Sequence, residues 1–231
     1  MNLPAYQAYR APVMSFRLMT SNLLHERVDT SHFEAMLDRY DPQVVVTQEL
    51  GPGPAEILAD RYPHHELHPS LDFTGRGIAT RFDADFGSIP MPGRDGTSAV
   101  LDLRGVTVRL AGVHLLNPIH FPWWVAARAR GRQLTGLFEW IEGGTGPLVV
   151  AGDFNASPQW PAYKRTAERL TDLVLENDPA AERTWAWRPG WPRLLRIDHV
   201  FGSGVAASQV SVENIRGTDH AALIVDIDVI G

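Results

Sequence analysis

The sequence predicts a mixed α/β domain in which β-sheets pack against each other and helices cover the outside. Strand-like runs outnumber helix-like runs, and several strand-like runs adjoin as hairpin-like pairs. No repeat, charge block or long linker divides the 231 residues. We therefore expect one domain over residues 14–231 and a loose leader at residues 1–13, because Met14 stands directly before the first strand-like run.

The expected strands are short apolar runs bounded by glycine, proline and polar clusters. In chain order they cover residues 16–20, 43–47, 77–81, 98–103, 107–113, 148–151, 196–201 and 222–227. The expected helices cover residues 32–40, 55–61, 125–141 and 161–170, with Ser31 as the N-cap of the first. The third helix has the strongest pattern, because its apolar residues recur every three or four positions: Leu134, Leu137, Phe138 and Ile141.

Composition narrows the possible functions. Hydrophobic residues make up 44% of the chain and charged residues 21%, as in ordinary globular proteins. The absence of cysteine excludes disulfides, thiolate metal sites and cysteine nucleophiles. A net charge of −6 disfavours a broad grip on nucleic acid, although a metal-bearing cleft can still hold a phosphate locally. No signal-like or membrane-spanning stretch is evident, so we expect a soluble, cytoplasmic monomer.

Two polar side chains follow the apolar run at residues 148–151. Asp153 and Asn155 lie two residues apart after Gly152, and in an extended chain they would point the same way. A carboxylate can orient or deprotonate water, while a carboxamide can donate to a phosphate oxygen, so the pair suits phosphoryl hydrolysis. An ordinary turn is an equally good interpretation of this segment taken alone.

An acid and an imidazole stand before the last expected strand, and a second acid interrupts the strand before it. Histidine titrates near neutrality, so His220 is a candidate general acid or base, and the neighbouring Asp219 a candidate cation ligand. Burying Asp198 is costly without a partner, so we expect it to orient His220 by a hydrogen bond. His199 would then face the other way and be structural. An isolated Asp-His pair is more often an ordinary loop feature.

Oxygen ligands also end the first two expected strands. Asn22 follows residues 16–20 and Glu49 follows residues 43–47. Hard oxygen donors without cysteine favour Mg²⁺, or Mn²⁺ or Ca²⁺, over zinc. His114 follows the strand at residues 107–113, where a lone histidine is more often a satisfied core residue than a catalytic one.

The order of these fragments resembles the endonuclease/exonuclease/phosphatase superfamily, which includes DNase-I-like nucleases, abasic-site endonucleases, inositol polyphosphate phosphatases and neutral sphingomyelinases. The resemblance runs from Phe16 to Ile227, and Gly-Asp-Phe-Asn is its most specific part. The motifs are Thr20-Ser21-Asn22, Gln48-Glu49, Gly77-Ile78-Ala79, Val113-His114-Leu115, Gly152-Asp153-Phe154-Asn155, Ile197-Asp198-His199 and Thr218-Asp219-His220.

The resemblance implies a four-layered α/β/β/α sandwich of two mixed sheets, and a phosphoric ester hydrolase that uses in-line attack without a covalent intermediate. It implies that the metal ligands are Asn22, Glu49 and Asp219. It also implies that Asp153 positions water, Asn155 holds phosphate, His220 is the catalytic imidazole oriented by Asp198, and His114 contacts a phosphate oxygen. Some nucleases of the superfamily carry a glutamate near Gly77 to support the counterpart of His114. That acid is missing here.

Aromatic and basic residues near these motifs are candidates for substrate binding. Trp185, Trp187 and Trp191 precede Asp198, while Phe121, Trp123 and Trp124 follow His114. We single out Trp124, Trp185 and Trp187, together with Arg76 beside Gly77, although aromatic residues in such loops can also merely cover the core.

The chain is therefore predicted to hydrolyse phosphodiester or phosphomonoester bonds in small molecules or lipid headgroups, because a full catalytic set occurs on an acidic chain. The alternative is a DNA or RNA nuclease that uses the same site, with the arginine-bearing helix at residues 125–141 touching the backbone. A non-catalytic binding module is a third possibility, disfavoured because every expected acid, amide and histidine is present.

Overall fold

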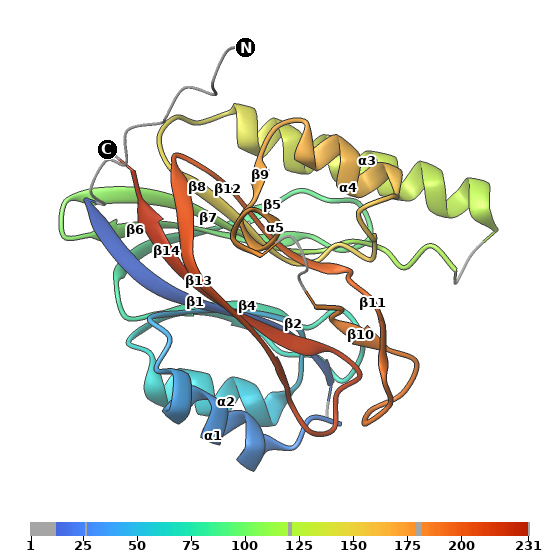
Figure 1. Cartoon of the computed structure of the whole chain (residues 1–231), viewed down its shortest axis with the longest axis horizontal. Coiled ribbons are helices and arrows are strands. Elements are labelled where there is room, and N and C mark those ends of the chain that lie inside the picture. The colour runs from blue at the N-terminus through green and yellow to red at the C-terminus, as the bar shows by residue number, and fades with distance from the viewer. Residues whose placement is uncertain (1–12, 26, 120–121, 179–181, 231) are drawn as a thin grey trace, which may run out of the picture.

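Two six-stranded mixed sheets pack face to face in the computed structural model, with helices outside both of them (Figure 1). The structure describes residues 13–25, 27–119, 122–178 and 182–230. The predicted four-layered α/β/β/α arrangement is confirmed over these residues. The expected leader lies almost entirely outside them.

The first sheet has the strand order β13-β14-β1-β2-β4-β3, in which β1 and β2 are parallel and the other neighbours antiparallel. Its strands are β1 (Met14–His25), β2 (Val44–Leu50), β3 (His64–His68), β4 (Arg76–Thr80), β13 (Val205–Asn214) and β14 (Ala221–Val229). Helices α1 (Thr30–Tyr40) and α2 (Pro52–Arg61) cover its outer face (Figure 1).

The second sheet has the order β5-β6-β7-β8-β12-β9, in which only β7 and β8 are parallel. Its strands are β5 (Asp83–Ile89), β6 (Gly96–Leu103), β7 (Val106–His114), β8 (Leu148–Asp153), β9 (Thr171–Asp172) and β12 (Asp198–Ser203). Helices α3 (Trp123–Glu142) and α4 (Pro161–Ala167) lie on its outer face, and the short α5 (Leu173–Asn177) follows β9. A two-stranded ribbon of β10 (Trp185–Ala186) and β11 (Arg193–Leu195) stands at one end of the sandwich.

Side chains along each central strand alternate between the two faces of the sheet, so the buried apolar residues form three clusters. Leu18 and Val46 of the first sheet meet Leu110 and Val149 of the second between the sheets. The apolar stripe of α3, including Leu137, packs on the outer face of the second sheet, as its spacing predicted. No described helix is long and apolar enough to cross a membrane.

Six strands escaped prediction: β3, β5, β9 and β13 lie at sheet edges, and β10 and β11 form the separate ribbon. An edge strand is paired on one side and half exposed, so it carries little apolar signal. The N-cap prediction was also wrong: Asp29, not Ser31, caps α1 by accepting from His32 N at 3.0 Å. The helix begins at Thr30, which puts Asp29 in the capping position.

The topology brings the predicted polar residues to one end of the sandwich. The parallel pair β1–β2 carries Asn22 and Glu49 there, and the parallel pair β7–β8 carries His114 and Asp153. The antiparallel β12 starts opposite the end of β8, because Asp198 pairs with Asp153. In the same way β14 starts near the end of β1, which places His220 at this end too.

Candidate active site

Asp153 and Asn155 are held together by a tight turn at the end of β8. Asn155 N donates to Asp153 Oδ1 at 2.7 Å, and Asn155 Nδ2 donates to Asp153 Oδ2 at 3.1 Å and to Leu115 O at 3.0 Å. Asn155 has a φ of 46°, so the side chains converge through a left-handed residue and not through an extended chain. The segment is therefore both a turn and a clustering of polar groups.

Gly152 makes this turn possible. Its φ is 141°, and a Cβ added here would lie 2.1 Å from Val113 O on the neighbouring parallel strand. No other residue fits between β7 and the turn, so the glycine of the motif has a geometric cause.

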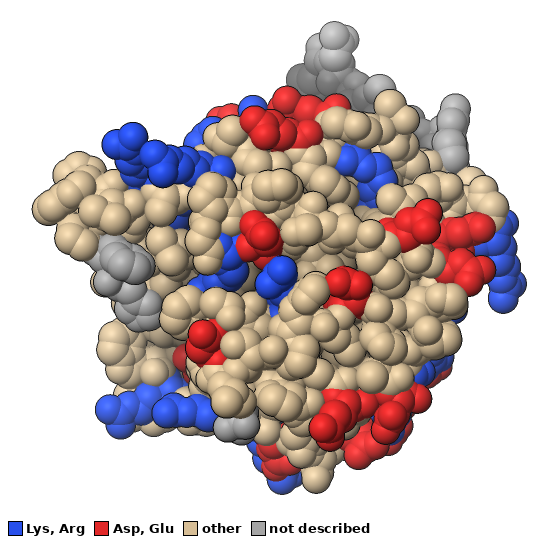
Figure 2. All heavy atoms as spheres, turned by 180° about the vertical axis from the view of Figure 1, so that it is seen from behind, with Lys and Arg blue, Asp and Glu red and all other residues tan. Residues whose placement is uncertain are grey.

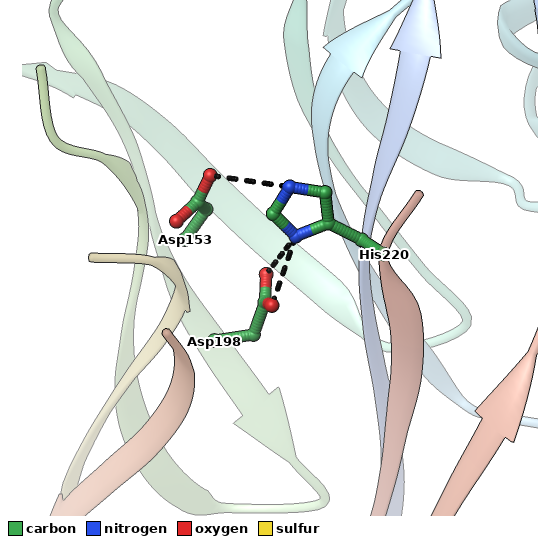
Figure 3. Close-up of side chains that lie close together, drawn as sticks. All are labelled: Asp153, Asp198 and His220. Carbon is green, nitrogen blue, oxygen red and sulfur yellow. Dashed lines mark hydrogen bonds and ion pairs between the residues drawn. The ribbon is translucent and has the colours of Figure 1, made fainter. Parts of the chain in front are cut away.

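Asp198 and His220 form the hydrogen bond expected from the sequence (Figure 3). His220 Nδ1 donates to Asp198 Oδ2 at 2.9 Å, and its Nε2 lies 3.9 Å from Asp153 Oδ2. Thr218 Oγ1 accepts from His220 N and donates to Asn22 O, which fixes the approach of the chain. His199 lies elsewhere, as predicted: its Nε2 donates to Ala156 O at 2.7 Å inside the core.

Burial and charge move the protonation equilibria of this group. Burial alone would lower the pKa of His220, but the charge of Asp198 and the hydrogen bond to it raise that pKa to about 10. Burial raises the pKa of Asp153 to about 7, against the opposing effect of the positive charge on His220. A protonated imidazole therefore faces a carboxyl group that exchanges its proton near neutral pH.

Asn22, Glu49 and His114 join the same network. Asn22 Nδ2 donates to Glu49 Oε1 and to Asp153 Oδ2, both at 3.2 Å. His114 Nε2 lies 3.4 Å from Asp153 Oδ2 and 3.8 Å from Glu49 Oε1. Burial and the positive charges of Arg94 and His220 hold the pKa of His114 well below its ordinary value, so this imidazole is neutral.

Comparison with known proteins assigns the chain to a family. The model of the endonuclease/exonuclease/phosphatase family matches residues 19–220. The chain belongs to this family. A search of curated proteins gives no match.

Solved structures of the family share the fold. A family protein from Beutenbergia cavernae superimposes with a TM-score of 0.75 at 22% identity, covering 94% of this chain and 72% of that one. A humanized D. rerio TDP2 gives 0.74 at 18%, covering 93% and 99%. The 3′ phosphatase NExo from Neisseria, bound to a product DNA hairpin, gives 0.73 at 22%, covering 92% and 99%. At these identities the likeness establishes the fold.

Members of the endonuclease/exonuclease/phosphatase family hydrolyse phosphoesters with the help of divalent metals, so the chain is an enzyme of this class. Two groups of side chains in the site offer ligand atoms for a cation.

Ligand atoms of Asp153, Asp198 and His220 lie within 4.8 Å of one another, the spacing that a metal site needs. However, Asp198 already binds His220 Nδ1, which favours an acid–base group over a cation site. Asn22, Glu49 and Asp219 offer the oxygen donors that hard cations prefer. Asp219 Oδ1 is buried with no hydrogen-bond partner among the described residues, as expected of an atom that binds a ligand. The donor atoms of this second set are of the type that suits a divalent cation, and Asn22 Oδ1 also accepts from Leu24 N at 3.1 Å.

Asp219 is less closely tied to the network than the other family motifs. Its Oδ2 accepts from Trp185 Nε1 at 3.1 Å, and no contact joins it to Asn22 or Glu49 among the described residues. Trp185 in turn bridges to His220 through the backbone, so the β10–β11 ribbon is attached directly to the site.

The remaining candidates for substrate binding lie on separate elements. Trp187 packs edge-on against Trp185 with ring centroids 5.9 Å apart and is 57% exposed. Trp124 is 60% exposed at the start of α3, where it packs against Trp123. Arg76 starts β4 opposite Gln48, and its Nε is buried without a partner among the described residues. Phe121 lies outside the described residues.

Sequence reasoning missed two side chains that border the site. His25 Nδ1 lies 3.1 Å from Glu49 Oε2, at a bulge that ends β1. Arg94 is buried in the loop between β5 and β6. That loop, Pro90 to Asp95, is rich in turn formers, among which an arginine is normally solvated, so no signal in the sequence could have identified it.

Proposed function

We propose that this family member hydrolyses phosphate esters of small molecules or lipid headgroups by in-line attack of an activated water. The observation that carries the proposal is the buried chain of Asp198, His220 and Asp153, in which one carboxylate orients an imidazole toward a second carboxyl group. Such a series of side chains supplies a base and an acid on neighbouring residues of the site.

Asp153 is the group that positions and deprotonates the water. Its pKa of about 7 lets it accept a proton near neutral pH. Asn155 holds both Asp153 oxygens in place, so its first role is orientation. Both N–H groups of its amide are already used, and a bond from Asn155 to phosphate would have to replace one of them.

The two histidines act on the phosphate side. His220, fixed by Asp198, presents a protonated Nε2 that can stabilise a phosphoryl oxygen or protonate the leaving oxygen. His114 is neutral and can donate a single hydrogen bond to a phosphate oxygen. Asn22, Glu49 and Asp219 would hold Mg²⁺, or Mn²⁺ or Ca²⁺, which when bound supplies positive charge for the transferring phosphoryl group.

Surface charge supports a small substrate. The chain carries a net charge of −6, and the face in Figure 2 shows acidic and basic side chains interspersed, without a continuous basic surface. A polyanion is gripped through a row of Lys and Arg residues, whereas a small ester needs charge only inside the site. The exposed rings of Trp124 and Trp187 can contact an apolar or aryl portion of such an ester.

The test is a hydrolysis panel in the presence of each divalent metal, with bis-p-nitrophenyl phosphate, p-nitrophenyl phosphate and supercoiled plasmid as substrates. Asp153→Asn and His220→Gln should abolish turnover, and Asp85→Asn, an exposed acid on β5, should leave it unchanged. Turnover that survives in both site variants would refute the proposed roles.

A nuclease is the second candidate. Arg128 and Arg132 are exposed on one face of α3, one turn apart, and could contact a nucleic-acid backbone. Efficient metal-dependent nicking of the plasmid, lost in Asp153→Asn and weakened in Arg128→Gln, would favour this candidate over the small ester.

A further inference from the structure

Arg94 is a buried cation without a partner. Only 9% of its surface is exposed, and its Nε and Nη1 atoms have no hydrogen-bond partner among the described residues. Arg94 forms no ion pair within the part of the chain that the structure describes, and its guanidinium carbon lies 4.8 Å from the centre of the Phe73 ring. Leaving a buried charge unpaired is costly, so this arrangement needs an explanation.

The other deeply buried arginines of the described chain show what a structural arginine looks like here. Arg130 donates to Leu116 O and Phe154 O, and Arg196 donates to Asp172 and His199. Each of them is at least as buried as Arg94, and each has its guanidinium satisfied by the protein. Arg94 is nearly as buried as these two arginines but lacks the hydrogen-bond partners that they have.

The register of the strands locates Arg94 beside the site. In the antiparallel pair β6–β7, Thr97 lies opposite Gly112, so the residues just before β6 continue alongside His114. Phe73 belongs to the segment before β4, whose start lies opposite the end of β2, next to Glu49. Arg94 therefore stands between the strand ends that deliver His114 and Glu49.

The electrostatic interactions of Arg94 also place it beside the site. Burial lowers the pKa of the Arg94 guanidinium, and the carboxylates of Glu49 and Asp153 oppose that shift, which means that both are near enough to act on it. In return, the positive charge of Arg94 helps to keep His114 neutral. The guanidinium thus belongs electrostatically to the site while it bonds to none of its carboxylates.

We propose that Arg94 binds the substrate, with its free guanidinium nitrogen atoms donating to non-bridging oxygen atoms of the phosphate group. An anion with several acceptor oxygens supplies the partner that the protein withholds. This inference rests on the proposed function, and it adds a substrate-binding residue from a loop that no motif of the sequence marks.

The test compares Arg94→Gln, Arg94→Lys and wild type. The matched control is Arg104→Gln, which removes an exposed arginine at the opposite end of β6. Arg94→Gln should lower kcat/KM by about 10- to 100-fold and raise the inhibition constant of inorganic phosphate by a similar factor, with partial recovery in Arg94→Lys. Arg104→Gln should match wild type.

Thermal unfolding with and without inorganic phosphate separates binding from folding. Wild type should be stabilised by phosphate and Arg94→Gln should not, while Arg94→Gln without phosphate should melt no lower than wild type, because the variant loses an unpaired buried charge. Unchanged phosphate protection in Arg94→Gln, or an equal loss in Arg104→Gln, would overturn the proposal. A wild type that is protected by phosphate but cleaves no ester would refute the proposed function and leave the role of Arg94 supported.

Discussion

Replacing Asp198 by asparagine tests the most specific feature of the site. Asp198 accepts from His220 Nδ1 at 2.9 Å, and both side chains are buried. Asparagine keeps the size of the side chain and removes its charge, so the change acts on the imidazole and not on the packing of β12.

The size of the effect follows from protonation. With a pKa of about 10, His220 is almost fully protonated at pH 7.5, whereas with the ordinary value of 6.5 it would be roughly one-tenth protonated. In the variant, burial still lowers the pKa of His220, while the charges of Asp153 and Asp219 still raise it. With the ordinary value as reference, the lost proton alone costs about 10-fold in kcat, and loss of the imidazole orientation brings the expected fall to roughly 10²- to 10⁴-fold.

Two assays check this reasoning. Nuclear magnetic resonance titration of metal-free protein should show the His220 imidazole titrating far above neutrality in wild type and near or below neutrality in Asp198→Asn. Metal-supplemented hydrolysis of p-nitrophenyl esters should lose turnover in the same variant, while thermal melting shows that it is folded. An unmoved His220 titration, or an unchanged kcat, would refute the argument that Asp198 sets the state of His220.

Two further predictions concern the scaffold. Gly152→Ala should destabilise the protein by about 2–4 kcal/mol in urea denaturation, because the new Cβ would meet Val113 O. The control is Gly105→Ala, which is also at positive φ but in open space, and it should cost about 1 kcal/mol. Equal losses of stability in the two variants would contradict the steric argument. Burial would raise the pKa of Asp172, but the neighbouring His199 side chain, whose Nδ1 lies 3.6 Å from Asp172 Oδ2, and the charge of Arg196 hold that pKa below its ordinary value. Its stabilising effect is therefore present above pH ~4 and lost as pH falls through the lower folded pKa, so Asp172→Asn should flatten the acid limb of the unfolding free energy; an unchanged limb would contradict it.

The central strands could be read from the sequence because they are buried on both sides. Strands such as β2 and β8 are nearly continuous apolar runs, and polar residues at their ends stand out against that background. Edge strands such as β5 and β13 lack this contrast, because half of their side chains face solvent. This contrast between apolar strands and the polar residues at their ends explains why the motif residues could be found, whereas the edge strands could not.

The details of the site depended on tertiary geometry that the sequence does not display. Asn155 reaches Asp153 through a left-handed turn, and the amide of Asn22 donates to two carboxylates. Neither arrangement follows from residue type and spacing. Arg94 was missed for a related reason: only its burial, which arises from the docking of two loops, separates it from an ordinary arginine in a turn.

The distribution of unsatisfied atoms ties these observations together. Buried side-chain atoms without hydrogen-bond partners, among the described residues, lie mostly at the end of the sandwich that carries the site: they include atoms of Gln48, Arg76, Arg94, Thr97, His114, Arg193 and Asp219. Buried charges away from that end, such as Asp172 with Arg196, have their partners. Because each unsatisfied group costs free energy of folding, their concentration at one end of the sandwich marks that end as the place where a polar ligand would stabilise the fold most. Phosphate would accept from the unsatisfied donor atoms at that end, and a divalent cation would bind the unsatisfied oxygen atoms there. Their joint addition should therefore raise the stability of the protein by more than the sum of their separate effects.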